Sequence, residues 1–233
     1  MKQVAMKMAA VALVAAALGL GACASTNRLG DYEFRGATLS TEMRTPPEPR
    51  LDIDYNVNID TGNAVLSGLS VLTNLAKANQ ASKAAGAMRD ALLFVDVPEI
   101  VRQETAHSCS SVLETMENDS PFSSDFRLVL DIHDWGIDAR SYGSSASLHM
   151  HLTASLYHTA SSELLWSRTV TVDQAATPSM FGLGQIVGDM VTAGALAQMT
   201  PSDLASGFKE LARESARSLV RRLERDLDAS RYY

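Results

Sequence analysis

Apolar and polar residues alternate over several short stretches of the chain, which is the pattern of β-strands with one face in water. The first stretch is RLDIDYNVNID at 50–60. Three more lie between 126 and 172, and a short polar turn at 159–162 separates the last two of them. We predict that these three form an antiparallel meander, with a bulge near Gly136 where the alternation slips.

Three longer stretches carry apolar residues three and four positions apart, the spacing of amphipathic helices. They span 63–93, 98–117 and 201–228. The last is the most clearly marked, because Thr200 can cap its first turn and Pro201 suits the first helical position. Its apolar stripe is expected to lie on the sheet.

These elements together predict an α+β fold. We expect a mostly antiparallel sheet of about four strands that is covered on one face by helices. An extra Ala- and Gly-rich helical elaboration is expected from the segments 63–93 and 180–199. Residues 50–233 are expected to form a single α/β domain.

The amino terminus has the layout of a secretory signal peptide. Lys2 and Lys7 precede an uncharged, apolar run at 8–22 that ends in small residues. The run is shorter than the roughly 20 apolar residues that a transmembrane helix needs, so a permanent spanning anchor is the weaker interpretation. We expect residues 1–22 to be removed.

The end of this run resembles the lipobox of bacterial lipoproteins. Leu20, Gly21 and Ala22 stand directly before Cys23. The resemblance implies that the Cys23 thiol carries acyl chains such as palmitate and becomes the first mature residue, and such chains hold a protein lastingly on its membrane. The alternative is an ordinary signal peptide with a cysteine near its cleavage site.

The residue after Cys23 indicates in which membrane the protein is anchored. In the enteric sorting rule, Asp at the next position retains a lipoprotein in the inner membrane, and this chain has Ala24. We therefore expect the periplasmic side of the outer membrane, with the inner membrane as the alternative. Residues 23–49 show no sustained period and end in a Pro-rich stretch, which predicts a lipidated tether ahead of a periplasmic domain.

Composition narrows the functional classes. Residues 1–22 contain two lysines and no acids, so the 20 basic and 27 acidic residues of the whole chain become 18 and 27, a formal charge of −9. Such an acidic chain disfavours nucleic acid as a partner. Once Cys23 is acylated, Cys109 is left without a cysteine to pair with inside the chain, and we expect a structural thiol there.

The most unusual segment of the mature chain is 180–199, MFGLGQIVGDMVTAGALAQM. It is strongly apolar, and two of its glycines are spaced to allow close backbone approach. The pattern favours a hairpin packed against the helix at 63–93. The alternative is a contact with a partner protein or with the membrane through Phe181, Leu183, Ile186, Val187 and Met190.

Catalytic and metal sites find little support in the sequence. It contains no motif typical of a nucleophilic serine, a phosphate-binding loop, a zinc protease or paired cysteines. His133, His149 and His151 could share the polar face of the meander and hold zinc, but no carboxylate or cysteine ligand is placed beside them by spacing. We therefore predict no catalytic residues, no metal and no cofactor.

The block 126–227 contains the hairpin SLYHTASSELLWSRTV and the long final helix. It resembles the small α/β domains of periplasmic auxiliary lipoproteins, those of ABC-type intermembrane lipid transport systems and the TolB-amino-terminal-like assembly lipoproteins. The resemblance implies a non-enzymatic domain that binds or steadies a larger envelope machine.

Three functional hypotheses follow. The first is an accessory or assembly subunit with an envelope protein as its partner. The second is a carrier of lipid or another hydrophobic ligand that uses the segment 180–199. The third is a metal-dependent enzyme at the histidines.

Overall fold

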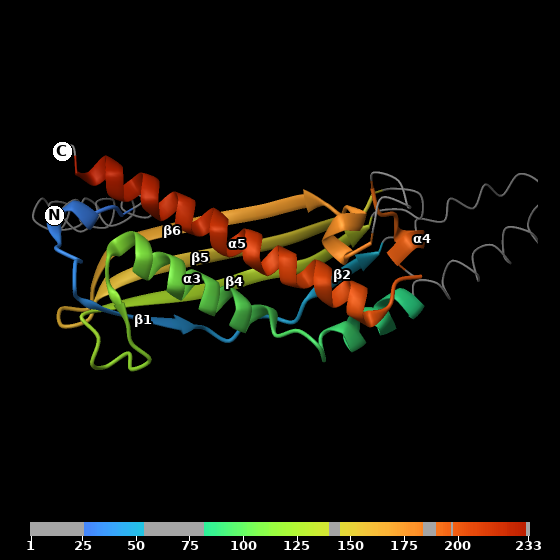
Figure 1. Ribbon diagram of the computed structural model, residues 1–233, viewed down its shortest axis with the longest axis horizontal. Coiled ribbons are helices and arrows are strands. Elements are labelled where there is room, and N and C mark those ends of the chain that lie inside the picture. Colours follow the sequence, from blue (N-terminus) through green and yellow to red (C-terminus); the bar gives the residue numbers. More distant parts are fainter. Residues whose placement is uncertain (1–25, 54–81, 140–144, 184–189, 197, 232–233) are drawn as a thin grey trace, which may run out of the picture.

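The computed structural model describes residues 26–53, 82–139, 145–183, 190–196 and 198–231. They form an elongated molecule in which long helices lie along one face of a twisted sheet (Figure 1). Residues 82–91 are also helical. The named elements, in chain order, are η1 (Leu29–Asp31), β1 (Thr38–Met43), β2 (Arg50–Ile53), α3 (Val97–Leu113), β3 (Met116–Glu117), β4 (Phe126–Ala139), β5 (Ser147–His158), β6 (Glu163–Ala175), η2 (Pro178–Phe181), α4 (Ala193–Leu196) and α5 (Pro201–Ser230).

Six strands form one mixed sheet in the order β3-β1-β4-β5-β6, and β2 also pairs with β4. β4, β5 and β6 are antiparallel neighbours, which confirms the predicted meander. β1 and β2 run parallel to β4, and β3 runs parallel to β1. The expectation of a mostly antiparallel sheet is therefore corrected to a mixed sheet, because the parallel partners are short strands from distant parts of the chain.

The length of β4, 14 residues, lets it pair with two short strands. β1 pairs with residues 126–130, and β2 pairs with residues 136–139. Gly136 has φ +152, and a Cβ at this position would overlap the backbone of Arg50 in β2. The bulge predicted near Gly136 lies slightly earlier, where the register with β5 shifts between Ile132 and Asp134.

The segment predicted as a tether, residues 23–49, is built into the fold from Thr26 onward. Leu29 in η1 and Leu39 in β1 are both buried in the core. β1 pairs with β4 over five consecutive residues. A short strand that contributes few buried side chains has too little alternation to stand out from a linker, so this prediction was wrong for the part of 23–49 that the structure describes.

The two long helices begin at side-chain caps. The Asp96 side chain accepts a hydrogen bond from the Glu99 N–H at the start of α3. The predicted helix 98–117 ends early, because Glu114 takes a left-handed backbone conformation and the next residues pair with β1 as β3. Of the predicted helix 63–93, the part before residue 82 lies outside the described residues.

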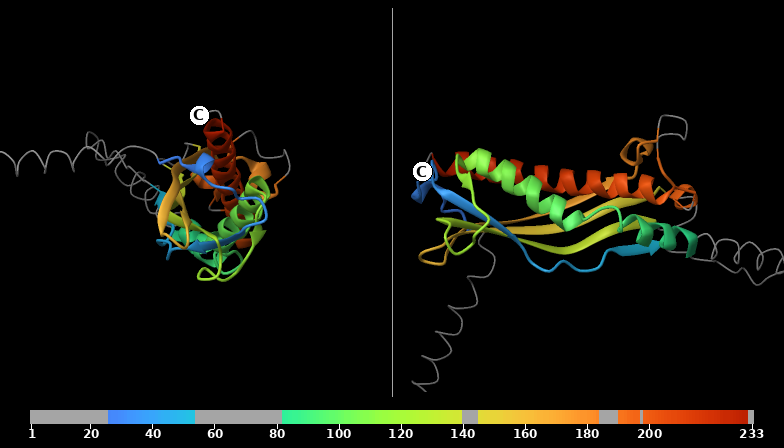
Figure 2. Two further views of the ribbon diagram at one scale, coloured as in Figure 1. Left: turned by 90° about the vertical axis from the view of Figure 1, so that its left-hand side faces the viewer. Right: turned by 60° about the horizontal axis from the view of Figure 1, so that its bottom comes forward.

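The start predicted for the last helix is confirmed. Thr200 caps α5 in a reciprocal capping box with Asp203, and Pro201 occupies the first helical position. Both long helices lie on the same side of the sheet in the two views of Figure 2. One face of the sheet is therefore covered, as the apolar pattern of the strands predicted.

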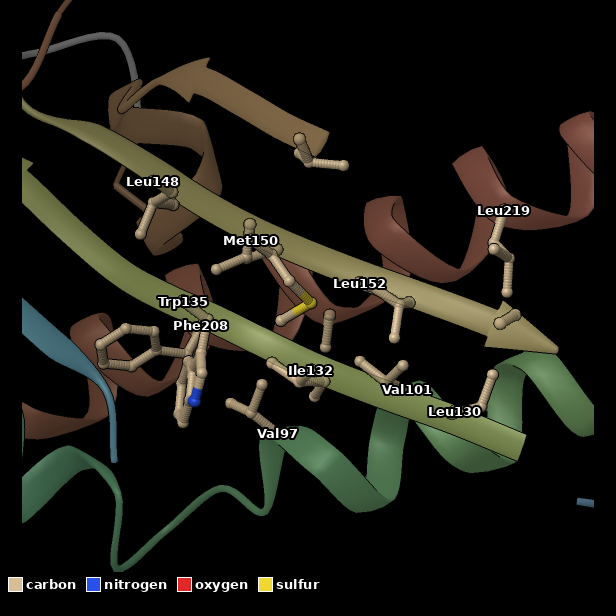
Figure 3. Packing of buried hydrophobic residues seen from close by; sticks show 14 of the residues in the cluster. Val97, Val101, Leu130, Ile132, Trp135, Leu148, Met150, Leu152, Phe208 and Leu219 are labelled. Carbon is tan, nitrogen blue, oxygen red and sulfur yellow. The ribbon is translucent and has the colours of Figure 1, made fainter. Parts of the chain in front are cut away.

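The core lies between this helical layer and the sheet (Figure 3). The Trp135 ring meets the Phe208 ring edge-on, with centroids 5.8 Å apart. Offset and edge-on ring pairs of this kind add to the stabilisation from burial. The labelled side chains of Figure 3 are Leu130, Ile132, Trp135, Leu148, Met150 and Leu152 from the sheet and Val97, Val101, Phe208 and Leu219 from the helices.

Candidate functional site

The described chain begins as a short addition to the edge of β6. The Arg28 N–H donates to the Leu165 carbonyl at 2.7 Å, and the Ser167 N–H donates to the Thr26 carbonyl at 3.3 Å. Three residue steps separate Cys23 from Thr26, so the two Cα atoms are at most about 11 Å apart. An acyl chain on Cys23 would therefore be attached close to this edge.

A polar network ties this segment to α5 and β6, and we call it the Asp226 network. The Asp226 carboxylate accepts a hydrogen bond from Trp166 Nε1 at 2.9 Å and forms an ion pair with Arg168 Nε at 2.7 Å. The Asp226 backbone carbonyl accepts a bond from Asn27 Nδ2 at 2.9 Å. The Arg168 and Asp226 side chains are only 14% and 17% exposed, so their ion pair is screened less than a surface pair.

Residues 28–31 also hold the first described segment against the domain. Leu29 is fully buried, and a Cβ on Gly30 would overlap the Ser230 carbonyl at the end of α5. Arg28 forms ion pairs with Asp31 and Glu163. The domain is thus held firmly at the point where the chain leaves toward Cys23.

A pocket of about 490 Å³ lies beside this segment. Buried leucines from η1, α3 and α5 line it together with charged residues. Arg35 pairs with Glu114 across it at 2.7 Å, and this hydrogen bond raises the pKa of the Arg35 guanidinium. The lining residues are Leu29, Gly30, Tyr32, Glu33, Phe34, Arg35, Leu113, Glu114, Leu227 and Arg231.

The predicted contact residues of segment 180–199 do not form one surface in the described part of the chain. Phe181 is 1% exposed, because its ring packs where Gly207 of α5 has no side chain. Leu183 is partly buried against the core, and Met190 is exposed. Phe181 is therefore a core residue, which corrects its predicted role. Ile186, Val187 and the intervening residues lie outside the described residues.

The histidines lie on the face of the sheet that the helices leave open. The His133 and His151 rings have centroids 5.1 Å apart, and His133 Nε2 lies 2.7 Å from Thr153 Oγ1. His149 Nε2 lies 3.6 Å from Asp134 Oδ2. Within the ranges that the structure describes, no three His, Cys, Asp or Glu side chains are grouped so that they could hold a metal ion.

Cys109 is fully buried on α3, next to the sheet. Burial raises the pKa of its thiol to about 12. Because the thiolate is the nucleophilic form of cysteine, this side chain is an inert part of the core. The expectation of a structural thiol is consistent with this burial.

Cys23 and the lipobox residues Leu20, Gly21 and Ala22 precede the described residues. The described helices include none that is both long and apolar enough to cross a membrane. Sequence reasoning did not find the Asp226 network. One residue in the sequence could have pointed to this network. The indole N–H of Trp166 needs a hydrogen-bond acceptor when the strand buries the ring.

Comparisons with known proteins do not assign a family. No family model matches the chain, and no curated protein matches it. Protein XCC0632 from Xanthomonas campestris, of family DUF330, has a solved structure with a TM-score of 0.43 and 11% identity, over 86% of this chain and 90% of that one.

Two further solved structures are less similar. PelC from Paraburkholderia phytofirmans, solved as a dodecamer, has a TM-score of 0.30 and 10% identity over 75% of this chain and 88% of that one. Lipoprotein GNA1162 from Neisseria meningitidis has a TM-score of 0.23 and 16% identity over 60% of this chain and 83% of that one. None of the three is similar enough to bring a function to this chain.

Proposed function

We propose that this protein is a periplasmic lipoprotein, held on the outer membrane by acyl chains on Cys23. We further propose that it serves as a non-catalytic accessory or assembly subunit of a cell-envelope complex. The observation that carries the proposal is the position of Thr26. It is hydrogen-bonded to β6 only three residues after Cys23, so an acyl chain on Cys23 would be joined to the folded domain through a very short segment.

Several features support a binding role over catalysis. The Cys109 thiol is buried with a raised pKa. His133 and His151 lie on an open sheet face, where His133 bonds to the Thr153 hydroxyl and contacts the His151 ring. The whole chain has a formal charge of −7, which favours a protein partner over nucleic acid. Ala24 supports the outer membrane, and the inner membrane is the alternative.

A role in binding lipid or another hydrophobic ligand is the alternative function. The burial of Phe181 removes one of the apolar residues on which it first depended. The pocket between η1, α3 and α5 is the better candidate site for such a ligand. Mass spectrometry of the protein extracted in mild detergent tests this role, because a carrier brings stoichiometric lipid that is not covalently attached.

Acylation is tested by growing cells that express the wild-type chain or Cys23→Ser with radiolabelled palmitate. We expect label on the wild type alone, and loss of Cys23→Ser from the membrane fraction. Cys109→Ser is the matched control, because it removes the other thiol and should keep the label. Equal membrane binding of Cys23→Ser and wild type would contradict the anchor.

The subunit role is tested by crosslinking in intact cells, followed by affinity purification and mass spectrometry. We expect one envelope protein to be enriched with the wild type and lost with Cys23→Ser, because the unanchored domain leaves the membrane. A monodisperse protein without a crosslinked partner would contradict this role and would leave the anchor standing.

A further inference from the structure

One long edge of the sheet is formed by β6, the last strand in the sheet order (Figure 1). It has 13 residues. The opposite edge is divided among β1, β2 and β3, which have six, four and two residues. Short edge strands discourage pairing with another molecule, whereas a long edge strand offers a row of backbone donors and acceptors.

The first described residues already pair with the start of this edge. The Arg28 N–H donates to the Leu165 carbonyl, and the Ser167 N–H donates to the Thr26 carbonyl. Odd-numbered residues of β6 therefore direct their backbone groups away from β5. The register between β5 and β6 is regular over 166–175, so the same direction holds further along the strand. The outward N–H groups there find no acceptor among the residues that the structure describes, and they belong to Thr169, Thr171 and Asp173.

The side chains of this free part of β6 alternate between two environments. Val170 pairs with Leu152 and Val172 pairs with Met150, so both valines point to the helix-covered face. Val172 is 8% exposed, and Val170 is partly buried against the core. The odd-numbered residues Thr169, Thr171 and Asp173 are exposed on the open face. The run Thr-Val-Thr-Val consists of β-branched residues, which favour strands.

This segment is complementary to a second copy of itself. If two β6 strands pair antiparallel about a two-fold axis at Thr171, each Val170 lies opposite the Val172 of the other copy, and each Thr169 lies opposite its Asp173. All outward backbone groups of the three odd-numbered residues then form hydrogen bonds across the axis. The Thr169 hydroxyl bonds to Thr153 and can still donate to the Asp173 carboxylate, because a hydroxyl both donates and accepts.

Other registers match less well. An axis at Val172 places Val170 opposite Gln174, so one valine loses its apolar neighbour. An axis at Asp173 places two carboxylates directly opposite each other, and like charges in that position destabilise a sheet. The axis at Thr171 is therefore the favoured register.

We propose that two copies of this chain join through residues 168–174 of β6, antiparallel about a two-fold axis at Thr171, and form one continuous sheet. In this dimer the chain before Thr26 leaves the edge of β6. The competing occupant of the edge is the chain itself, because the antiparallel bridge between Asn27 and Trp166 directs residues 23–25 along β6. Three extended residues span only about 10 Å and reach Val170, so Thr171 stays available to a second copy.

Single cysteines along β6 test the register in the full-length protein in mild detergent. Thr171→Cys places two sulfurs at the axis, where paired Cα atoms lie about 5.5 Å apart and a disulfide can form. Thr169→Cys and Asp173→Cys are matched controls on the same exposed face. In each control the two cysteines are four residues, about 13 Å, apart along the strands, too far for a disulfide.

Copper phenanthroline serves as the oxidant, and the wild type, with its buried Cys109, supplies the background. We expect Thr171→Cys to give at least about tenfold more crosslinked dimer than either control, because only its sulfurs meet the distance requirement.

The oligomeric state tests the backbone pairing. Thr171→Pro removes the outward N–H and leaves the bonds to β5 in place, since edge strands tolerate proline at such a position. Thr171→Val keeps the N–H and is the control. Sedimentation should show dimers for the wild type and Thr171→Val, and a dissociation constant at least about tenfold higher for Thr171→Pro, because two hydrogen bonds at the axis are lost.

Three results would overturn the dimer. They are a monomeric wild type without a crosslink at residue 171, equal crosslinking through all three cysteine positions, and a Thr171→Pro dimer as stable as the wild type. The first of these would assign the edge to residues 23–25 or to another protein. The palmitate label on Cys23 is independent of all three, so the proposed anchor is supported or lost separately.

Discussion

The two faces of the β4–β6 meander differ although they are built from the same strands. On the helix-covered face, Met150 and Leu152 of β5 are buried to 1% exposure or less. On the open face, their neighbour His151 is exposed, and Thr153 bonds sideways to His133 and to Thr169. Because successive side chains of a strand point to opposite faces, one strand can serve both environments.

This difference shows where the stability of the domain resides. The covered face gains its free energy from apolar burial and close packing. The hydroxyl and imidazole groups of the open face exchange water for neighbouring polar atoms, which contributes little net free energy. The open face can therefore vary without loss of the fold, and the covered face cannot.

Substitution of neighbouring residues on β5 gives the largest expected contrast. Leu152→Ala removes buried volume and should lower the free energy of unfolding by about 2–5 kcal/mol. His151→Ala, one residue earlier, should change it by no more than about 0.5 kcal/mol. Urea unfolding of the two variants measures both values, and similar losses would break the distinction between the faces.

A substitution in the Asp226 network tests whether the folded domain tolerates buried polar groups that have lost their hydrogen-bond acceptor. Asp226→Ala leaves the Arg168 charge and the Trp166 N–H without their acceptor, and should destabilise the domain by about 2–3 kcal/mol. Asp228→Asn, on an exposed turn of the same helix, is the control and should be nearly neutral. A neutral Asp226→Ala would mean that water replaces the lost acceptor.

The cap of α5 tests a contribution of the helix that does not depend on the sheet. Thr200→Ala removes the acceptor for the Asp203 N–H and should cost about 1 kcal/mol. Thr200→Ser keeps a hydroxyl and should retain most of the stability. Thermal unfolding of both variants shows the difference, and an equal loss in both would indicate that packing, and not the hydrogen bond, matters at this residue.

The outer surface of α5 should give the smallest effect, and one that depends on pH. Hydrogen bonds from Arg221 and Arg217 lower the pKa of Glu214 below its usual value. A carboxylate with a lowered folded-state pKa contributes stability above its unfolded pKa, near 4.5, and loses it as the pH falls through the lower folded value.

Glu214→Gln should therefore be less stable than the wild type at pH 7, by less than about 1 kcal/mol, because the ion pairs are at the surface. The gap should be smaller at an acidic pH of about 3, below the unfolded pKa near 4.5. Urea midpoints at the two pH values measure it. A gap of equal size at both would show that the charge of Glu214 is not its cause.

Much of the architecture could be predicted from local pattern. The alternation in 126–172 identified the meander, and the combination of Thr200 and Pro201 marked the start of α5. These features depend on residues close together in the chain. The strand β1 was missed because its six residues form a strand only through pairing with β4, about 87 residues later in the chain.

The candidate site could be predicted only in part. Cys23 was singled out by a local motif, and its acylation stays a prediction. Phe181 was a possible surface contact in the sequence because apolarity alone does not distinguish a docking residue from a core residue. The space at Gly207 that receives its ring lies on another element.

The sequence by itself determined the meander and the two long helices, which of their faces are apolar, and the place of Cys23 after an apolar amino-terminal run. Periodicity and helix caps depend on residues that are close together in the chain, so they can be recognised from the sequence. Only the tertiary structure decided that Thr26 joins β6 and that Asp226 bonds to Trp166 and Asn27. Such contacts join residues up to 199 positions apart, and their partners are selected by the geometry of the packed chain.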